Sequence, residues 1–73
     1  MNLTLEVITE NGKHHHCLDD INVAFRLFET YIRTYVGNKL KLNLIDNETG
    51  VILADYTFSI YVDPDVHTAY ILA

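Results

Sequence analysis

A single stretch of helical periodicity, residues 20–36, constrains the fold of this chain more than any other feature. Apolar residues recur there at three- and four-residue spacing, which predicts one amphipathic helix. Asp19 precedes the stretch as the predicted N-cap, and Gly37 follows it as a residue that tolerates a left-handed helix end. The predicted apolar stripe consists of Ile21, Ala24, Phe25, Phe28, Ile32 and Tyr35.

The segments on either side of this helix alternate between apolar and polar residues, which is the period of β-strands. Residues 3–9, 39–46 and 51–61 are predicted strands, and residues 66–73 are a candidate for a short fourth strand. Asn11-Gly12 is expected to end the first strand, and residues 13–18 are expected to form a loop that leads into the helix. Gly50 ends a predicted turn between the second and third strands, which indicates a hairpin.

These elements predict one α+β domain over residues 1–73, a two-layer sandwich in which a single helix packs on a three- to four-stranded mixed sheet. The predicted order is β-α-β-β, followed by the short fourth strand. Because strand, helix and strand form a crossover, the first two strands are expected to be parallel. A helix about 10 Å wide covers only part of one face of a sheet with strands about 4.8 Å apart. The opposite face is therefore expected to have no cover.

Apolar side chains on this open face, together with an apolar C-terminal segment, predict contact with another protein. Two-fold dimers are the commonest oligomers, so the expected partner is a second copy of the chain in a homodimer. The alternative is a monomer whose C-terminal segment folds over its own sheet. The predicted interface residues are Ile8, Ile45, Leu53, Tyr70, Ile71 and Leu72.

The chain carries ten acidic and five basic residues, for a formal net charge of −5, and has no Lys or Arg after Lys41. Proteins that bind nucleic acid concentrate Lys and Arg on one surface, so direct binding of nucleic acid is not expected. The acidic half suggests an inhibitor that occupies the basic nucleic-acid-binding site of a target protein. A solvated surface that keeps the protein soluble is the simpler alternative. The residues of this acidic surface are Asp46, Glu48, Asp55, Asp63 and Asp65.

The segment His14-His15-His16-Cys17 is the most unusual in the chain. Imidazole and thiolate groups bind metal ions, which makes weak metal binding a further alternative function. Adjacent ligands do not match the paired spacing of structural zinc sites, so a polar loop is the competing interpretation. An enzymatic Cys-His pair is not expected, because a nucleophile and its base normally meet across a fold. The candidate metal ligands are His14, His16, Cys17 and His67.

Sequence signatures of catalysis are otherwise missing: there is no phosphate-binding glycine loop, serine elbow or calcium loop, and no cofactor is expected. The single cysteine, Cys17, excludes an internal disulfide and suits a reducing compartment. The longest apolar run, residues 69–73, is too short to span a bilayer, and no signal-peptide pattern is visible. We therefore expect a cytoplasmic, non-catalytic interaction module with a regulatory or accessory role and no membrane partner.

Overall fold

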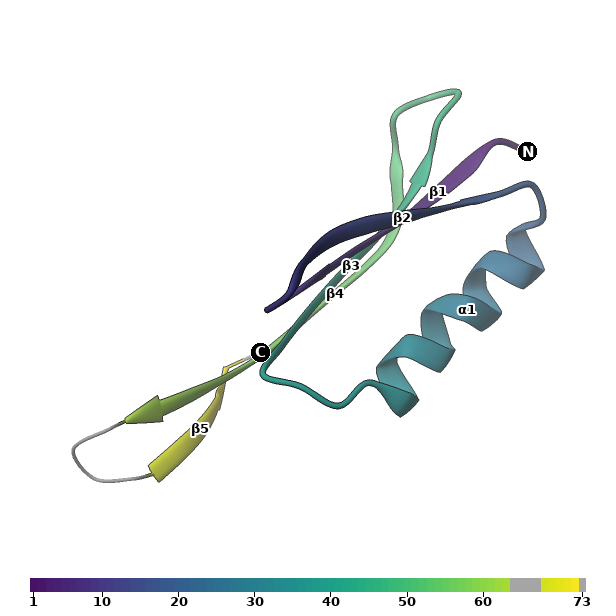
Figure 1. Ribbon diagram of the computed structural model, residues 1–73. Helices are drawn as coiled ribbons and strands as arrows, with labels where there is room; N and C mark the ends of the chain where they lie inside the picture. The colour runs from purple at the N-terminus through teal and green to yellow at the C-terminus, as the bar shows by residue number, and fades with distance from the viewer. Residues whose placement is uncertain (64–67, 73) are drawn as a thin grey trace.

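The protein consists of one helix packed on one face of an antiparallel sheet, as the computed structural model in Figure 1 shows. The structure describes the backbone of residues 1–63 and 68–72 and the side chains of residues 1–60. The predicted α+β class and the single helix are confirmed. In chain order the elements are β1 (Leu3–Thr9), β2 (Gly12–Leu18), α1 (Ile21–Thr34), β3 (Lys39–Asp46), β4 (Ile52–Asp63) and β5 (Thr68–Leu72).

The strands lie in the order β2-β1-β3-β4-β5, and every neighbouring pair is antiparallel. The predicted mixed sheet, the β-α-β-β order and the parallel pairing of the first two predicted strands are therefore wrong. The cause is β2, because residues 13–18 form a strand where the sequence indicates a loop. This strand reverses the chain before α1, so the chain returns from the helix antiparallel to β1.

The turn between β1 and β2 contains only Glu10 and Asn11, since Thr9 pairs with Gly12. Gly12 has φ 130°, a conformation that residues with a side chain rarely adopt. Asn11 and Gly12 therefore reverse the chain into β2, as this residue pair commonly does in hairpins. No alternation reveals β2 in the sequence, because polar side chains lie on both of its faces.

The helix begins after Asp20, and not after Asp19 as the sequence suggests. The Asp20 carboxylate accepts hydrogen bonds from the backbone N–H groups of Asn22 at 2.8 Å and Val23 at 3.2 Å. These bonds satisfy donors that have no partner within the first turn of a helix.

Gly37 does not cap the helix, which ends at Thr34, and its backbone is not left-handed. It is instead a point of close approach, where an added Cβ would collide with the Glu10 carboxylate and the Tyr35 hydroxyl. The Tyr35 hydroxyl donates to Glu10 Oε2, and Lys39 N–H donates to the same oxygen at 3.2 Å. The hydrogen bond from Tyr35 lowers the pKa of Glu10, and the same bond raises the pKa of Tyr35. The two hydrogen bonds to Glu10 hold the β1–β2 turn against the segment that follows α1.

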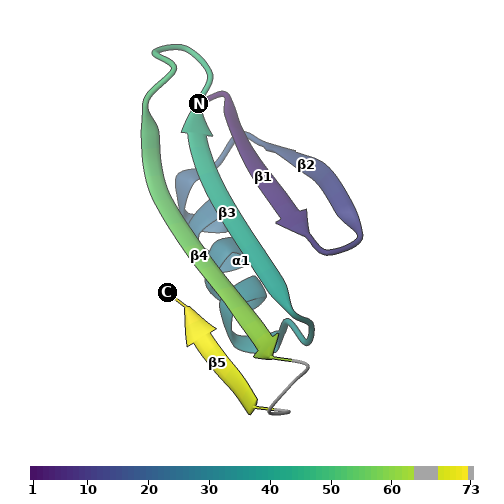
Figure 2. The ribbon, with the colours of Figure 1, turned by 90° about the vertical axis from the view of Figure 1, so that its left-hand side faces the viewer.

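The hydrophobic core lies between α1 and the central strands β1 and β3. Every second residue of these strands points toward the helix, which is why the buried positions follow a period of two. Figure 2 shows the helix behind the sheet, with no helix on the near face. The buried residues are Leu3, Leu5, Val7, Ala24, Phe28, Leu40, Leu42 and Leu44.

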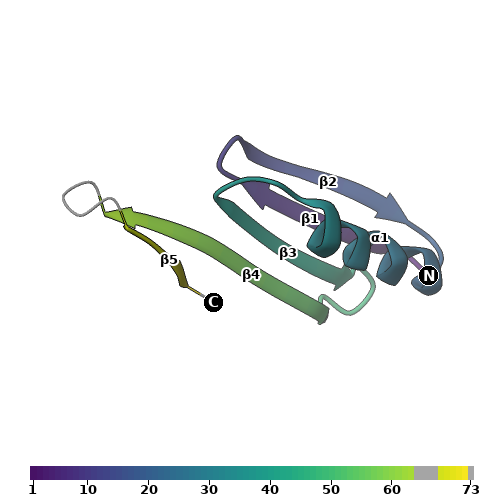
Figure 3. The same cartoon turned by 90° about the horizontal axis from the view of Figure 1, so that it is seen from below.

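Strand β4 is the longest and pairs with two different partners along its length. Its first part pairs with β3, up to Ser59, and the part from Ser59 to Asp63 pairs with β5. The distal hairpin of β4 and β5 extends past the helix, so the molecule measures 48 × 21 × 19 Å (Figure 3). The predicted short fourth strand is confirmed over residues 68–72, where it extends the sheet and does not fold across the open face.

Candidate functional site

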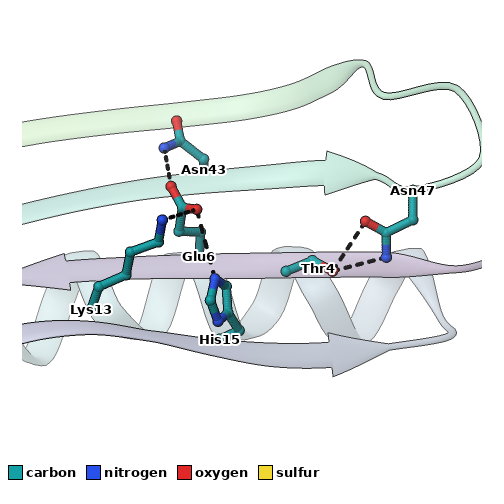
Figure 4. A network of polar contacts seen from close by, with 6 residues as sticks. All are labelled: Thr4, Glu6, Lys13, His15, Asn43 and Asn47. Carbon is teal, nitrogen blue, oxygen red and sulfur yellow. Dashed lines mark hydrogen bonds and ion pairs between the residues drawn. The ribbon is translucent and has the colours of Figure 1, made fainter.

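The sheet face that turns away from α1 carries a polar network centred on Glu6 (Figure 4). Asn43 Nδ2 donates to Glu6 Oε1 at 3.0 Å. Lys13 Nζ lies 3.2 Å from Glu6 Oε2, and His15 Nε2 lies 3.8 Å from the same oxygen. The hydrogen bond from Asn43, followed by that from Lys13, lowers the pKa of Glu6. The centre of the open face is therefore polar, although the sequence suggests an apolar one.

A second polar cluster lies at the end of the same face and ties the β3–β4 turn to β1. Asn47 Nδ2 lies 2.8 Å from Thr4 Oγ1 and 2.9 Å from Asn2 Oδ1, within hydrogen-bond distance of both. The contact between Asn47 and Thr4 lies beside the Glu6 network in Figure 4, and both contacts extend the polar character of the face.

The predicted interface residues do not gather into one patch where the structure describes their side chains. Half-buried Ile8 pairs with Lys41, whereas half-buried Ile45 pairs with Ile52 beyond the Glu6 network. Leu53 is exposed at a β-bulge near the start of β4. The backbone of the remaining three, Tyr70, Ile71 and Leu72, lies in β5, and their side chains fall outside the described residues.

The edge of β4 that faces away from β3 is unpaired over residues 54–58 in the part of the chain that the structure describes. The β-bulge bounds this segment on one side, and β5 begins its pairing at Ser59 on the other. Ile60 donates its backbone N–H to Asn38 O at 2.8 Å, toward the β3 side. Because backbone groups alternate in direction along a strand, those of Asp55 and Thr57 point to the unpaired edge.

A small pocket lined by aliphatic and aromatic side chains adjoins this edge on the helix side of the sheet. Its volume is about 80 Å³, and it is lined by Ile32, Tyr35, Leu40, Tyr56 and Phe58. Pockets for substrates and cofactors usually measure about 300–1,000 Å³, so this one is sized for a single side chain. The sequence places Tyr56 and Phe58 on one face of a strand, but it does not show that α1 leaves that strand partly uncovered.

The unpaired segment, residues 54–58, together with this pocket is called the β4 edge site below. Phe25 lies two helical turns before Ile32, on the same side of α1, and is 39% exposed. The β4 edge site therefore combines unpaired backbone groups with adjacent apolar surface, which are the two components used when a strand is added to a sheet.

The structure describes the side chains of three of the predicted acidic residues, Asp46, Glu48 and Asp55. Asp46 and Glu48 lie at the β3–β4 turn, where Asp46 Oδ1 accepts a hydrogen bond from the backbone of Glu48 at 3.0 Å. Asp55 lies within β4 and Asp63 at its far end, eight residues or about 27 Å further along the strand. Asp65 lies outside the described residues.

The β2 strand separates the histidines that the sequence presents as one tract. His14 and His16 pair with Val7 and Leu5 and so share the helix side of the sheet. Both lie close to one atom, the Tyr31 hydroxyl oxygen, which is 3.2 Å from His14 Nε2 and 2.7 Å from His16 Nε2.

The other members of the predicted metal set lie elsewhere. Cys17 pairs with Thr4, as His15 pairs with Glu6, and so belongs to the opposite face. His67 lies outside the described residues. Within the described part of the chain, no group of three or more His, Cys, Asp or Glu residues is arranged to hold a metal ion.

No protein-family model, curated protein or solved structure matches this chain. None of the described helical segments is both long and apolar enough to cross a membrane.

Replacing Glu6 with Gln is expected to lower the free energy of unfolding at pH 7 by about 1 kcal/mol, because a charged hydrogen-bond acceptor is lost. Since folding lowers the pKa of Glu6 from 4.5, its contribution is complete above that pH and is lost as the pH falls through the folded-state pKa. The difference between the wild type and Glu6→Gln should therefore shrink in acid. Urea titrations at pH 7 and about pH 3 measure this difference.

Glu48→Gln, in an exposed turn, is the control for the change in net charge. A difference between the wild type and Glu6→Gln that stays the same at both pH values would contradict the stabilising role of the Glu6 network.

Proposed function

We propose that this protein is a non-catalytic interaction module that binds a second copy of itself through the β4 edge site. The observation that carries the proposal is the bounded, unpaired segment of residues 54–58 beside a pocket lined by aliphatic and aromatic side chains. Adding a strand to such an edge gains backbone hydrogen bonds, and the adjacent pocket gains apolar contact. A regulatory or accessory role is consistent with a protein that acts by binding alone.

The two edges of the sheet differ in their suitability for pairing. Natural proteins protect exposed edges with charged side chains, especially lysine, or with proline. The β2 edge carries Lys13 and three histidines. The segment 54–58 contains neither lysine nor proline, and its single charge is Asp55. The β4 edge is therefore the better candidate for binding another strand.

Self-complementarity of this segment supports a second copy as the partner. In an antiparallel pair related by a two-fold axis, the residue on the axis pairs with itself, and its neighbours pair reciprocally. An axis at Thr57 would require Ser59, which already pairs with β5. An axis at Asp55 would place two carboxylates directly opposite each other, which is destabilising.

An axis at Tyr56 avoids both problems. It pairs Asp55 of each copy with Thr57 of the other copy. The backbone groups of these two residues point to the unpaired edge. Four backbone hydrogen bonds can then form across the axis. The same register sets the small Ala54 against the large Phe58 on the helix side, next to the pocket.

Sedimentation velocity at micromolar concentrations tests self-association itself. We expect a dimer, and a monomer throughout this range would contradict homodimerisation. The Tyr56 register has a separate test by disulfide formation, carried out in a Cys17→Ser background.

Tyr56→Cys is expected to form an intermolecular disulfide under mild oxidation, because paired Cα atoms without mutual backbone hydrogen bonds lie about 4.5 Å apart. Asp55→Cys is the matched control, since its Cα atom would lie more than about 7 Å from its counterpart in this register. Non-reducing electrophoresis measures the cross-linked fraction. Faster linking of Asp55→Cys would overturn the register, and linking of neither variant in a dimeric protein would place the interface elsewhere.

A further inference from the structure

We propose that His14 and His16 form a chelating site for one divalent transition-metal ion, at the position where their Nε2 atoms meet the Tyr31 hydroxyl. The two Nε2 atoms converge on one point, the hydroxyl oxygen of Tyr31, at 3.2 and 2.7 Å. The imidazole rings meet edge to face, with centroids 5.4 Å apart. Two nitrogen donors are thus already directed toward a common position, and this site is independent of the β4 edge site.

The strand geometry of β2 creates this arrangement. Side chains two residues apart on a strand point to the same face, with Cα atoms about 6.8 Å apart. That spacing lets two imidazole rings reach one ion from the same side. His15, between them, points to the other face and contacts Glu6 instead. A pair of histidines separated by one residue therefore acts as a chelate on a strand, whereas three histidines in a loop have no such fixed geometry.

The ligand chemistry selects the class of ion. Imidazole nitrogen suits Zn²⁺, Ni²⁺ and Cu²⁺, and affinity for a given nitrogen site rises toward Cu²⁺. The Tyr31 hydroxyl occupies the position between the rings, so it either moves aside or becomes a third ligand. Water completes the coordination shell, because His14 is exposed and His16 is half-buried. Such a site binds more weakly than a structural zinc site with four protein ligands.

The same contacts have a simpler interpretation, in which the histidines only hold α1 against β2 by hydrogen bonding to Tyr31. The two interpretations differ in what a metal ion does. If the cluster is purely structural, replacing His14 or His16 should weaken metal binding no more than replacing His15. The chelate predicts that removing either of the two converging imidazoles abolishes most of the affinity, while removing His15 does not.

Isothermal titration of the tag-free protein with Cu²⁺, Ni²⁺ or Zn²⁺ alone tests this proposal. His14→Ala and His16→Ala are each expected to weaken binding by about tenfold or more, because the second imidazole acts as a tethered ligand. His15→Ala is the matched control, with the same side chain one residue away on the opposite face, and should stay within about twofold, because it supplies no tethered ligand. Circular dichroism of each variant verifies that the fold is retained.

Tyr31→Phe separates the role of the hydroxyl from that of the imidazoles. If the phenol oxygen is a ligand, the Cu²⁺ complex of the wild type has a phenolate charge-transfer absorption that Tyr31→Phe lacks. If the hydroxyl moves aside, Tyr31→Phe keeps the affinity, and the two-histidine chelate still stands. Equal loss of affinity in His14→Ala, His15→Ala and His16→Ala would overturn the proposal, as would binding that survives the double variant His14→Ala/His16→Ala.

Discussion

Replacing Leu42 with alanine is expected to lower the free energy of unfolding by about 3 kcal/mol, because a fully buried leucine is lost and a cavity remains. Leu42 lies at the centre of β3, between Val7 of β1 and Tyr56 of β4. Few other elements can move to fill the space, because one helix covers this side of the sheet. A domain of this size has a total stability of about 4–11 kcal/mol, so the loss is a large fraction of it. Urea denaturation followed by circular dichroism measures the change.

Ile45→Ala on the same strand is the matched control. Ile45 points to the open face and is only half-buried, so its replacement should cost about 1 kcal/mol. The contrast tests the register of β3 directly, because a shift by one residue would exchange the two faces. Equal losses for both variants would show that the open face is buried in the native protein, although Ile45 is only half-buried in a single chain.

Replacing Thr57 with proline is expected to abolish most self-association while the single-chain fold is retained. The N–H group of Thr57 points to the unpaired edge, so its removal leaves the pairing of β3 with β4 intact. Proline is tolerated on edge strands at such positions. In the Tyr56 register, each copy loses the Thr57 N–H donor, and the proline ring obstructs the approach of the second strand. The dissociation constant should rise by about a hundredfold or more, on the basis of two lost hydrogen bonds of about 1 kcal/mol each and this obstruction.

Thr57→Val is the control for this experiment, because valine keeps the N–H group and the β-branched shape. Sedimentation velocity of both variants over a concentration series gives the two dissociation constants, and circular dichroism verifies the fold. A Thr57→Pro variant that dimerises as tightly as the wild type would exclude the β4 edge as the interface. A loss of self-association in both variants would assign the contact to the Thr57 hydroxyl and not to the backbone.

Strand β2 is the element that the sequence conceals most completely. The alternation of leucine with polar residues identifies β3, and the same period identifies β1 and most of β4. His14, His15 and His16 give no alternation, so their segment is predicted as a loop, although its backbone pairs along its whole length with β1. The missing strand changes the topology from a crossover to a hairpin. It also changes the candidate metal ligands, because Cys17 leaves the set and Tyr31 enters it.

Periodicity in the sequence determines which residues of each element are buried, because a side chain must leave water wherever its strand or helix meets another layer. The single helix, the leucine faces of the sheet and the incomplete cover of that sheet all follow from this pattern. The order of the strands, the position of the unpaired segment in β4 and the convergence of His14 and His16 on Tyr31 depend on pairing between distant segments. Backbone hydrogen bonds are the same for every residue type except proline, so local sequence carries little information about which strands become neighbours. The tertiary structure decides it, because the core requires the leucine faces of β1 and β3 to lie side by side beneath α1.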